Sequence, residues 1–196
     1  MKIQPIFSNF IATDFLNIDN DLLAVYCKKQ YQEQKIINPT APCGFDLLDP
    51  AIKLIADKFT EKLNEVHNQL GFVKGSKQEI AKAWINVNSN PYIDAAHNHP
   101  GWFFVGVYYV KADPASGRIT YLNPNSGMVA TILPGMVENG NIFNCSDFNQ
   151  PPIPGTLVIF PSWLMHYVTQ NTGESERISI AFNSRIIMPG GLNEYN

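Results

Sequence analysis

The spacing of apolar residues changes once along the chain, near Lys82, and this change limits the folds that the sequence can adopt. Before Lys82, apolar residues recur at helical spacing, as they do on the buried face of an amphipathic helix. After it, Ala83, Ile85 and Val87 alternate with Trp84, Asn86 and Asn88, which is typical of a strand. The chain is therefore expected to place helices first and strands afterwards.

Short alternating segments continue from Lys82 almost to the C-terminus, separated by turn signals such as Pro100-Gly101 and Asn171–Gly173. The expected strands are Ala83–Asn88, Tyr92–His99, Trp102–Lys111, Arg118–Leu122, Met128–Leu133, Thr156–Phe160, Leu164–Gln170 and Glu176–Ile187. Seven or eight short strands with regular punctuation predict a mainly β fold, either an antiparallel sandwich or an open barrel.

Two helices are expected before these strands. Candidate N-caps for the first are Asn17, Asp19, Asn20 and Asp21, and this helix would run to about Gln34. For the second, Asp49 would be the cap and Pro50 the first helical residue, with Gly71 just past the end. Its apolar stripe consists of Ile52, Ile55, Phe59, Leu63 and Val66, which would pack on the outside of a sheet. Residues 3–12 fit an edge strand or an extended arm.

Composition excludes several classes of protein. The 196 residues are 45% hydrophobic with a net charge of −3 and no basic patch, which argues against nucleic-acid binding. No apolar run is long enough for a membrane span, and the N-terminus lacks the pattern of a signal peptide. Cys27, Cys43 and Cys145 are odd in number and far apart, as expected for a reducing compartment. We expect a cytoplasmic protein, and both a monomer and a homodimer are compatible with the sequence.

Three of the four histidines are candidates for metal ligands. His97 and His99 are two residues apart in an expected strand, so both imidazoles can reach one point. His166 lies in a mostly apolar run, where a buried imidazole needs partners for its nitrogens. The alternatives are polar strand-end residues for the first pair and a core histidine bonded to the backbone for His166. His67, at the end of the second helix, fits an ordinary helix-end cation.

Arg177 is one of only three arginines and lies inside an expected strand. Alternation places Arg177, Ser179 and Ala181 on one face of that strand. A buried guanidinium is costly unless a carboxylate meets it, so a ligand carboxylate could be its partner, with Ser179 adding a hydrogen bond. The alternative is a surface arginine paired with Glu174 or Glu176.

Several segments taken together resemble a known family. They are His97-Asn98-His99, Tyr108-Tyr109-Val110, Gly117–Pro124 (GRITYLNP), Gly155–Val168 (GTLVIFPSWLMHYV) and Arg177–Ser179. This series, which covers about Trp84 to Arg185, is similar to the iron(II)- and 2-oxoglutarate-dependent oxygenases. The resemblance is closest to the prolyl-hydroxylase-like branch and to a group of oxygenases found in bacteria and marine phages.

The resemblance implies a double-stranded β-helix, or jelly-roll, barrel with two supporting N-terminal helices. Residues 1–196 would form one oxygenase-like domain, with helical support over residues 1–80 and the jelly-roll core over 81–190. It also implies two cofactors, iron(II) and 2-oxoglutarate, and hydroxylation of a small-molecule or peptide substrate, with an amino-acid side chain as one option. By the same resemblance, His97 and His166 match metal ligands, Arg177 and Ser179 match the site of the distal 2-oxoglutarate carboxylate, and Tyr109 matches a tyrosine that binds the same carboxylate.

The chain departs from the family pattern at His99, where the family has Asp or Glu. We keep His99 as the third ligand and Asp94 as the alternative, although odd spacing from His97 would put Asp94 on the opposite face of a regular strand. A three-histidine site also fits a cupin-type dioxygenase that uses no 2-oxoglutarate. A third possibility is a jelly-roll binding module without catalytic activity.

Overall fold

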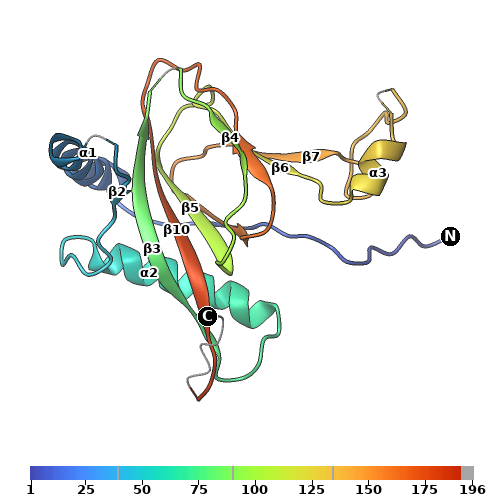
Figure 1. Ribbon diagram of the computed structural model, residues 1–196, viewed down its shortest axis with the longest axis horizontal. Coiled ribbons are helices and arrows are strands. Elements are labelled where there is room, and N and C mark those ends of the chain that lie inside the picture. The colour runs from blue at the N-terminus through green and yellow to red at the C-terminus, as the bar shows by residue number, and fades with distance from the viewer. Residues whose placement is uncertain (39, 90, 134, 191–196) are drawn as a thin grey trace.

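The strands of the chain form two antiparallel sheets (Figure 1). The larger sheet has six strands in the order β1-β8-β5-β10-β3-β2, and the smaller has four in the order β4-β9-β6-β7. The protein is thus mainly β, as expected. The two sheets remain separate, however, because no hydrogen-bonded strand pair joins them among the described residues, so the expected barrel is not closed.

The computed structural model describes residues 1–38, 40–89, 91–133 and 135–190. The helices are α1 (Asn20–Ile37), α2 (Lys53–Gln69) and α3 (Ser126–Thr131). The strands are β1 (Ala12–Phe15), β2 (Cys43–Gly44), β3 (Lys77–Asn88), β4 (Asp94–His97), β5 (Phe104–Lys111), β6 (Ile119–Leu122), β7 (Asp147–Gln150), β8 (Thr156–Pro161), β9 (His166–Val168) and β10 (Arg177–Ile187). None of these described helices combines the length and the hydropathy of a membrane span.

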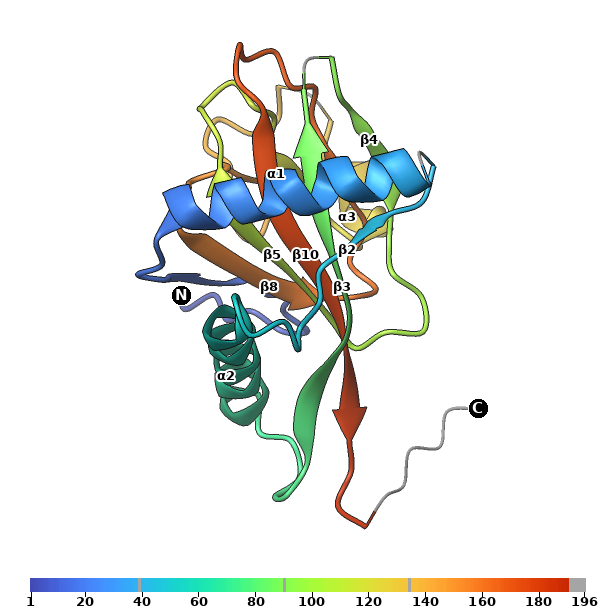
Figure 2. The same ribbon diagram turned by 90° about the vertical axis from the view of Figure 1, so that its left-hand side faces the viewer.

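Helices α1 and α2 lie across one face of the large sheet (Figure 2). Their apolar side chains share a core with alternate residues of the sheet, and Phe59 of α2 lies at the centre of it. The Phe59 ring lies 5.2 Å from that of Tyr108 on β5 and 5.8 Å from that of Phe182 on β10, measured between centroids. One face of the central strands therefore packs against the helices.

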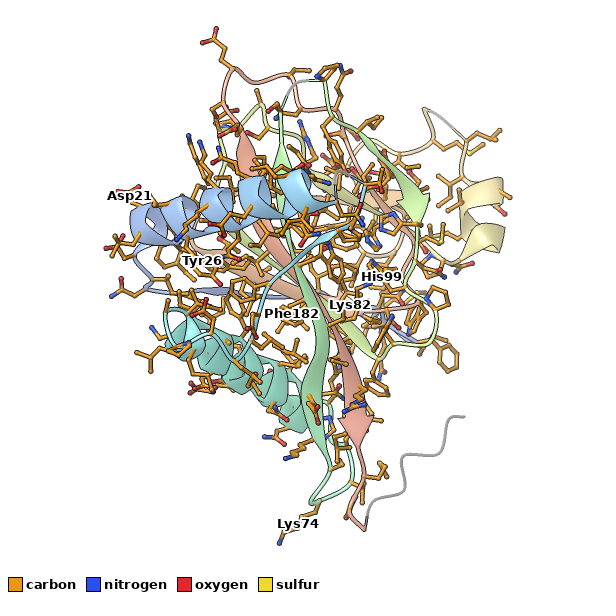
Figure 3. All side chains as sticks on the ribbon, turned by 60° about the vertical axis from the view of Figure 1, so that its left-hand side comes forward. Asp21, Tyr26, Lys74, Lys82, His99 and Phe182 are labelled. Atoms are coloured by element: carbon orange, nitrogen blue, oxygen red, sulfur yellow. The ribbon has the colours of Figure 1, made fainter. Side chains whose placement is uncertain are left out.

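The opposite face of the large sheet packs on the small sheet. A second cluster combines Val105 and Tyr109 of β5 with Tyr121 of β6 and Val168 of β9. In β10, Ile178, Ile180 and Phe182 belong to the helix-side core, so alternation turns the intervening odd-numbered residues toward the small sheet. Figure 3 shows this division, with Phe182 on the helix side of β3 and β10 and His99 on the other side.

The strand expected at Met128–Leu133 is wrong, because the chain there forms the short helix α3. Asn125 caps this helix, and its side-chain oxygen accepts a hydrogen bond from the Met128 amide. The fourth strand of the small sheet is instead β7, which pairs with β6 and which the sequence pattern did not predict. Its first three residues are exposed, so it lacks the apolar alternation of the other strands.

The start of α2 also differs from the prediction. The helix begins at Lys53 with Ile52 as its N-cap, and no side chain caps it. Asp49 accepts hydrogen bonds from the Ala51 amide and the Tyr26 hydroxyl, so it orders the turn before the helix. At the N-terminus, residues 1–11 have no regular secondary structure, and β1 begins at Ala12 and pairs with β8.

His67 is a buried, neutral core residue and not a helix-end cation. Its side chain is 1% exposed, and its Nε2 lies 2.8 Å from Ser76 Oγ. Because the Ser76 hydroxyl donates to the Val73 carbonyl, His67 Nε2 must carry the proton. Its Nδ1 is then free to accept a hydrogen bond from Gln78 Nε2, at 3.3 Å. Burial lowers the pKa of His67 below its usual value.

Replacing Gly106 with Ala should destabilise the fold. A Cβ at this position would lie 2.0 to 2.4 Å from three ring carbons of Phe182, which is fully buried and cannot move aside. We expect a loss of about 1–3 kcal/mol in urea unfolding. Gly44→Ala is the matched control, because nothing lies within 4 Å of a Cβ there. Phe182→Leu should recover part of the loss in the double variant, and strictly additive losses would contradict the packing described.

The stability of the protein should fall as the pH drops below about 6.5, in part because of His67. Its pKa is lowered in the folded state, so below the unfolded value the unfolded chain binds a proton that the folded protein does not. Urea unfolding at pH 7.5 and at pH 5.5 should therefore give a steeper loss for wild type than for His67→Gln. The difference in slope is at most about 1.4 kcal/mol per pH unit. Equal slopes would show that folding does not lower the pKa of His67.

Candidate metal centre

Three imidazoles from two distant parts of the chain meet at one end of the small sheet. His97 of β4 lies directly opposite His166 of β9 in the antiparallel pair, and their ring centroids are 4.4 Å apart. His99 follows two residues after His97, with its centroid 5.1 Å from His97 and 5.3 Å from His166. One potential ligand atom from each of the three rings lies within 4.8 Å of the others.

His99 reaches this cluster from outside a strand. The expected strand Tyr92–His99 is shorter, because β4 ends at His97 and its register shifts between Asp94 and His97. The His99 backbone is fixed instead by its amide, which donates to the Ser162 carbonyl at 2.8 Å. Its ring stacks on Trp84 of β3, with centroids 6.1 Å apart and planes at 24°. These contacts hold His99 beside the β4–β9 pair.

Backbone carbonyls orient two of the three rings. His97 Nδ1 lies 2.7 Å from the Ala95 carbonyl oxygen, and His166 Nδ1 lies 2.8 Å from that of Leu164. A carbonyl only accepts, so each Nδ1 carries a proton, and in the neutral form of each ring the lone pair is on Nε2. A metal ion needs a lone pair of this kind, because it binds the neutral imidazole.

Burial keeps two of the three imidazoles uncharged. Burial, reinforced by the charges of His166 and His97, lowers the pKa of His99 to about 4. Burial also lowers the pKa of His166 to about 4, although its hydrogen bond to the Leu164 carbonyl acts in the opposite direction. Both imidazoles are therefore neutral near pH 7.

Asp94 is not part of the cluster. It lies opposite Val168 in the β4–β9 pair, and the group of potential ligand atoms within 4.8 Å contains His99 and not Asp94. Of the two candidates for the third position, the geometry groups His99 with His97 and His166.

Arg177, at the start of β10, is buried and has no carboxylate partner among the described residues. Its Nη1 donates to the carbonyls of Ser116 at 3.3 Å and Gly117 at 3.5 Å, and its Nε makes no hydrogen bond. Glu176, which the surface alternative would pair with it, forms an ion pair with Lys28 of α1 instead. Burial lowers the pKa of Arg177, but a guanidinium stays protonated at neutral pH.

Two buried tyrosine hydroxyls also lack partners, and one of them is near Arg177. Tyr109 lies opposite Ser179 in the β5–β10 pair, and its hydroxyl makes no hydrogen bond within the described chain. The same is true of the Tyr121 hydroxyl on β6. Burial raises the pKa of Tyr109. The positive charge of Arg177 acts in the opposite direction, which shows that the guanidinium lies close to the Tyr109 hydroxyl. Unsatisfied buried polar atoms are rare in proteins and indicate a missing partner.

The sequence analysis did not single out three residues of this region, namely Trp84, Tyr121 and Asn183. The alternation of β10 could have indicated Asn183, because it places this residue on the same face of the strand as Arg177 and Ser179. The contact of Trp84 with His99 depends on how the chain leaves β4, which the sequence pattern does not define.

A family model described as "Putative 2OG-Fe(II) oxygenase" matches residues 82–183, just over half of the chain. The chain belongs to this family. It is accordingly an oxygenase that uses iron(II) and 2-oxoglutarate, as the resemblance in its sequence predicted. No curated protein sequence matches it significantly.

Solved structures similar to this oxygenase share its fold at low sequence identity. A Pseudomonas putida prolyl-4-hydroxylase has 16% identity and a TM-score of 0.59, covering 91% of this chain and 88% of its own. The α-ketoglutarate-dependent carbocyclase SnoK from nogalamycin biosynthesis has 9% identity and a TM-score of 0.60, covering 95% and 85%. HygX from Streptomyces hygroscopicus, solved with nickel and 2-oxoglutarate, has 11% identity and a TM-score of 0.52, covering 90% and 81%.

The residues of the oxygenase fit the two groups that its family uses. Three imidazoles with ligand atoms within 4.8 Å of one another suit a divalent metal ion. Arg177 Nε and the Tyr109 hydroxyl, both buried and unpaired, suit a carboxylate.

Proposed function

We propose that His97, His99 and His166 hold iron(II) in this oxygenase and that Arg177, Tyr109 and Ser179 hold the distal carboxylate of 2-oxoglutarate. The observation that carries the proposal is the combination of a three-imidazole cluster with a buried guanidinium that lacks a carboxylate partner among the described residues. A buried arginine is stable only if its charge is met, and a dicarboxylate ligand supplies that charge.

Each group has a separate part in binding. Arg177 attracts the distal carboxylate, and the Tyr109 hydroxyl donates a hydrogen bond to it. Ser179 lies opposite Tyr109 in the sheet, on the same face of β10 as Arg177. Because these groups are buried, the carboxylate is removed from water and the attraction is stronger than it would be at the surface. The distal carboxylate thereby fixes the position of the ligand as a whole.

The reaction proposed is hydroxylation of a C–H bond. Dioxygen supplies one oxygen atom to the new hydroxyl group and the other to succinate, and 2-oxoglutarate loses CO2 and provides two electrons. Iron, when bound, supplies the reactivity toward dioxygen. The chain contributes the geometry and the apolar surroundings of His166, whose ring lies 4.8 Å from that of Phe160.

Replacement of the usual carboxylate ligand by His99 changes the charge of the centre. Three neutral imidazoles leave the charge of a divalent ion uncompensated, whereas one carboxylate would cancel half of it. We therefore expect weaker binding of iron(II) than in a site with two histidines and one carboxylate.

The finer assignments for this chain are also proposals. We propose that residues 1–196 form one domain, with residues 1–80 as support and 81–190 as a double-stranded β-helix core. The substrate proposed is a small molecule or a peptide, with an amino-acid side chain favoured by the likeness to a prolyl-4-hydroxylase. The free cysteines Cys27, Cys43 and Cys145 support a cytoplasmic location.

A second candidate function is a three-histidine dioxygenase of the cupin type. The observation in its favour is that His99 completes the cluster in place of a carboxylate. Arg177 would then bind a carboxylate of the substrate itself. A binding module without catalysis is the remaining alternative, and failure to bind any divalent metal would favour it.

Anaerobic titration tests the proposed binding sites. A weak visible absorption band of the chelate should appear only when iron(II) and 2-oxoglutarate are both present, and it should be lost in His166→Ala. Arg177→Met should weaken 2-oxoglutarate binding about 30-fold or more, because truncating one partner of a buried charge pair costs about 2–5 kcal/mol. Arg185→Met is the matched control, because Arg185 is exposed and pairs with Glu79. Unchanged affinity in Arg177→Met would contradict the assignment.

Product analysis separates the two catalytic candidates. With iron(II), 2-oxoglutarate and oxygen, the proposed function predicts slow succinate formation even without the substrate, and none under nitrogen. Iron-dependent oxygen uptake on a substrate without succinate formation would instead support the cupin-type enzyme. Absence of metal binding, measured by calorimetry with iron(II), would exclude both.

A further inference from the structure

As a metal ligand, the imidazole of His99 must be in one particular tautomer, a requirement that a carboxylate ligand would not have. A neutral imidazole carries one proton on either of its two nitrogens, and only the other nitrogen can bind a metal. In His97 and His166, backbone carbonyls fix the proton on Nδ1. No backbone carbonyl performs this function for His99 within the described chain, so another acceptor must select its tautomer.

Asn183 is placed to provide that acceptor. It lies on β10 between Lys82 of β3 and Val105 of β5, and alternation turns it toward the small sheet, as it does Arg177. Its side chain is 4% exposed, and its Oδ1 is fully buried without a well-aligned hydrogen bond. A buried amide oxygen without a partner is costly, which indicates that it serves an interaction not completed within the chain alone.

A candidate for that interaction is His99. Ala181, on the same face of β10 as Asn183, lies opposite Trp84 of β3, and the Trp84 ring stacks on His99, so Asn183 lies in the same part of the site as His99. In agreement, Asn183 acts to raise the pKa of His99, against the larger effect of burial. The Trp84 ring, stacked against His99, limits the movement of the imidazole to its own plane.

We propose that Asn183 is a positioning residue, whose buried amide oxygen accepts the ring proton of His99 and leaves the other nitrogen of His99 free to face His97 and His166. The inference rests on the proposed metal centre and deepens it. Each of the three imidazoles then has one acceptor for its ring proton: the Ala95 carbonyl, the Leu164 carbonyl and the Asn183 side chain. Only the third is a side chain, so only the third can be removed by mutation.

The tautomer is measurable without any metal. In metal-free protein labelled with nitrogen-15 at histidine, long-range proton–nitrogen correlation at pH 7.5 should show one tautomer for His99, assigned by its loss in His99→Gln. Asn183→Leu, of similar size but without an acceptor, should give a mixture of tautomers. Asn183→Asp keeps an acceptor oxygen and should restore a single tautomer. An unchanged His99 signal in Asn183→Leu would overturn the proposal.

Gln78→Leu is the matched control for the loss of a buried amide. Gln78 is 1% exposed and contacts His67, on the helix side of the sheet. This variant should change the signal of His67 and leave that of His99 unchanged. A change in the His99 signal would show that any buried amide lost from this sheet disturbs the site, and would overturn the specific role of Asn183. If Asn183→Leu does not fold cooperatively, Asn183→Ala replaces it.

Cobalt(II) titration, followed by visible absorption, measures the consequence for metal binding. Loss of a group that orients a metal-bound histidine typically weakens binding about 10–100-fold, which is the change expected for Asn183→Leu. Asn183→Asp should bind cobalt at least as tightly as wild type, because it also adds a negative charge near the ion. A changed tautomer with unchanged cobalt affinity would overturn the positioning role. If wild type binds no cobalt, the proposed function fails, and the tautomer measurement still decides whether Asn183 orients His99.

Discussion

The rest of the structure depends on the burial of β10 on both of its faces. Its ladders with β3 and β5 satisfy its backbone, and its even-numbered side chains fill the core beneath α1 and α2. From Arg177 to Asn183 the odd-numbered side chains are also buried, so each polar group among them must find a partner in the interior. Arg177 and Asn183 are two such groups, and each retains a buried polar atom without a hydrogen bond. The apolar side chains on one face stabilise the strand. The polar side chains on the other face are available for binding.

The small sheet contributes the complementary half of the site. The pairing of β4 with β9 brings His97 and His166 together although they are far apart in sequence, and the Ser162 carbonyl fixes the backbone of His99 beside them. The proposed metal ligands and the proposed carboxylate partners therefore come from opposite sheets. A chelating ligand that contacts both groups would link the sheets across the gap where no strand pair joins them.

The sequence predicted most of the strands because alternation records which face of a strand is buried. It did not predict β7, whose exposed residues follow no such pattern, and it assigned β-branched Val129 and Thr131 to a strand where the Asn125 cap begins a helix instead. The four candidate site residues His97, His99, His166 and Arg177 were recognisable because imidazoles and guanidiniums are uncommon in apolar strands. Asn183 was not, because an asparagine at that spacing is equally typical of a turn or a strand end. The burial of His67 depends on contacts with Ser76 and Gln78 beyond the helix, which helical spacing does not reveal.

The partial exposure of two of the three imidazoles has a consequence for the cell. His97 and His99 reach solvent, whereas His166 does not. An ion bound there can enter and leave while both sheets stay intact, so its exchange does not require unfolding. Occupancy then follows the free concentration of the metal from moment to moment, by mass action. With a weakly held ion, the turnover of this protein would rise and fall with the supply of iron.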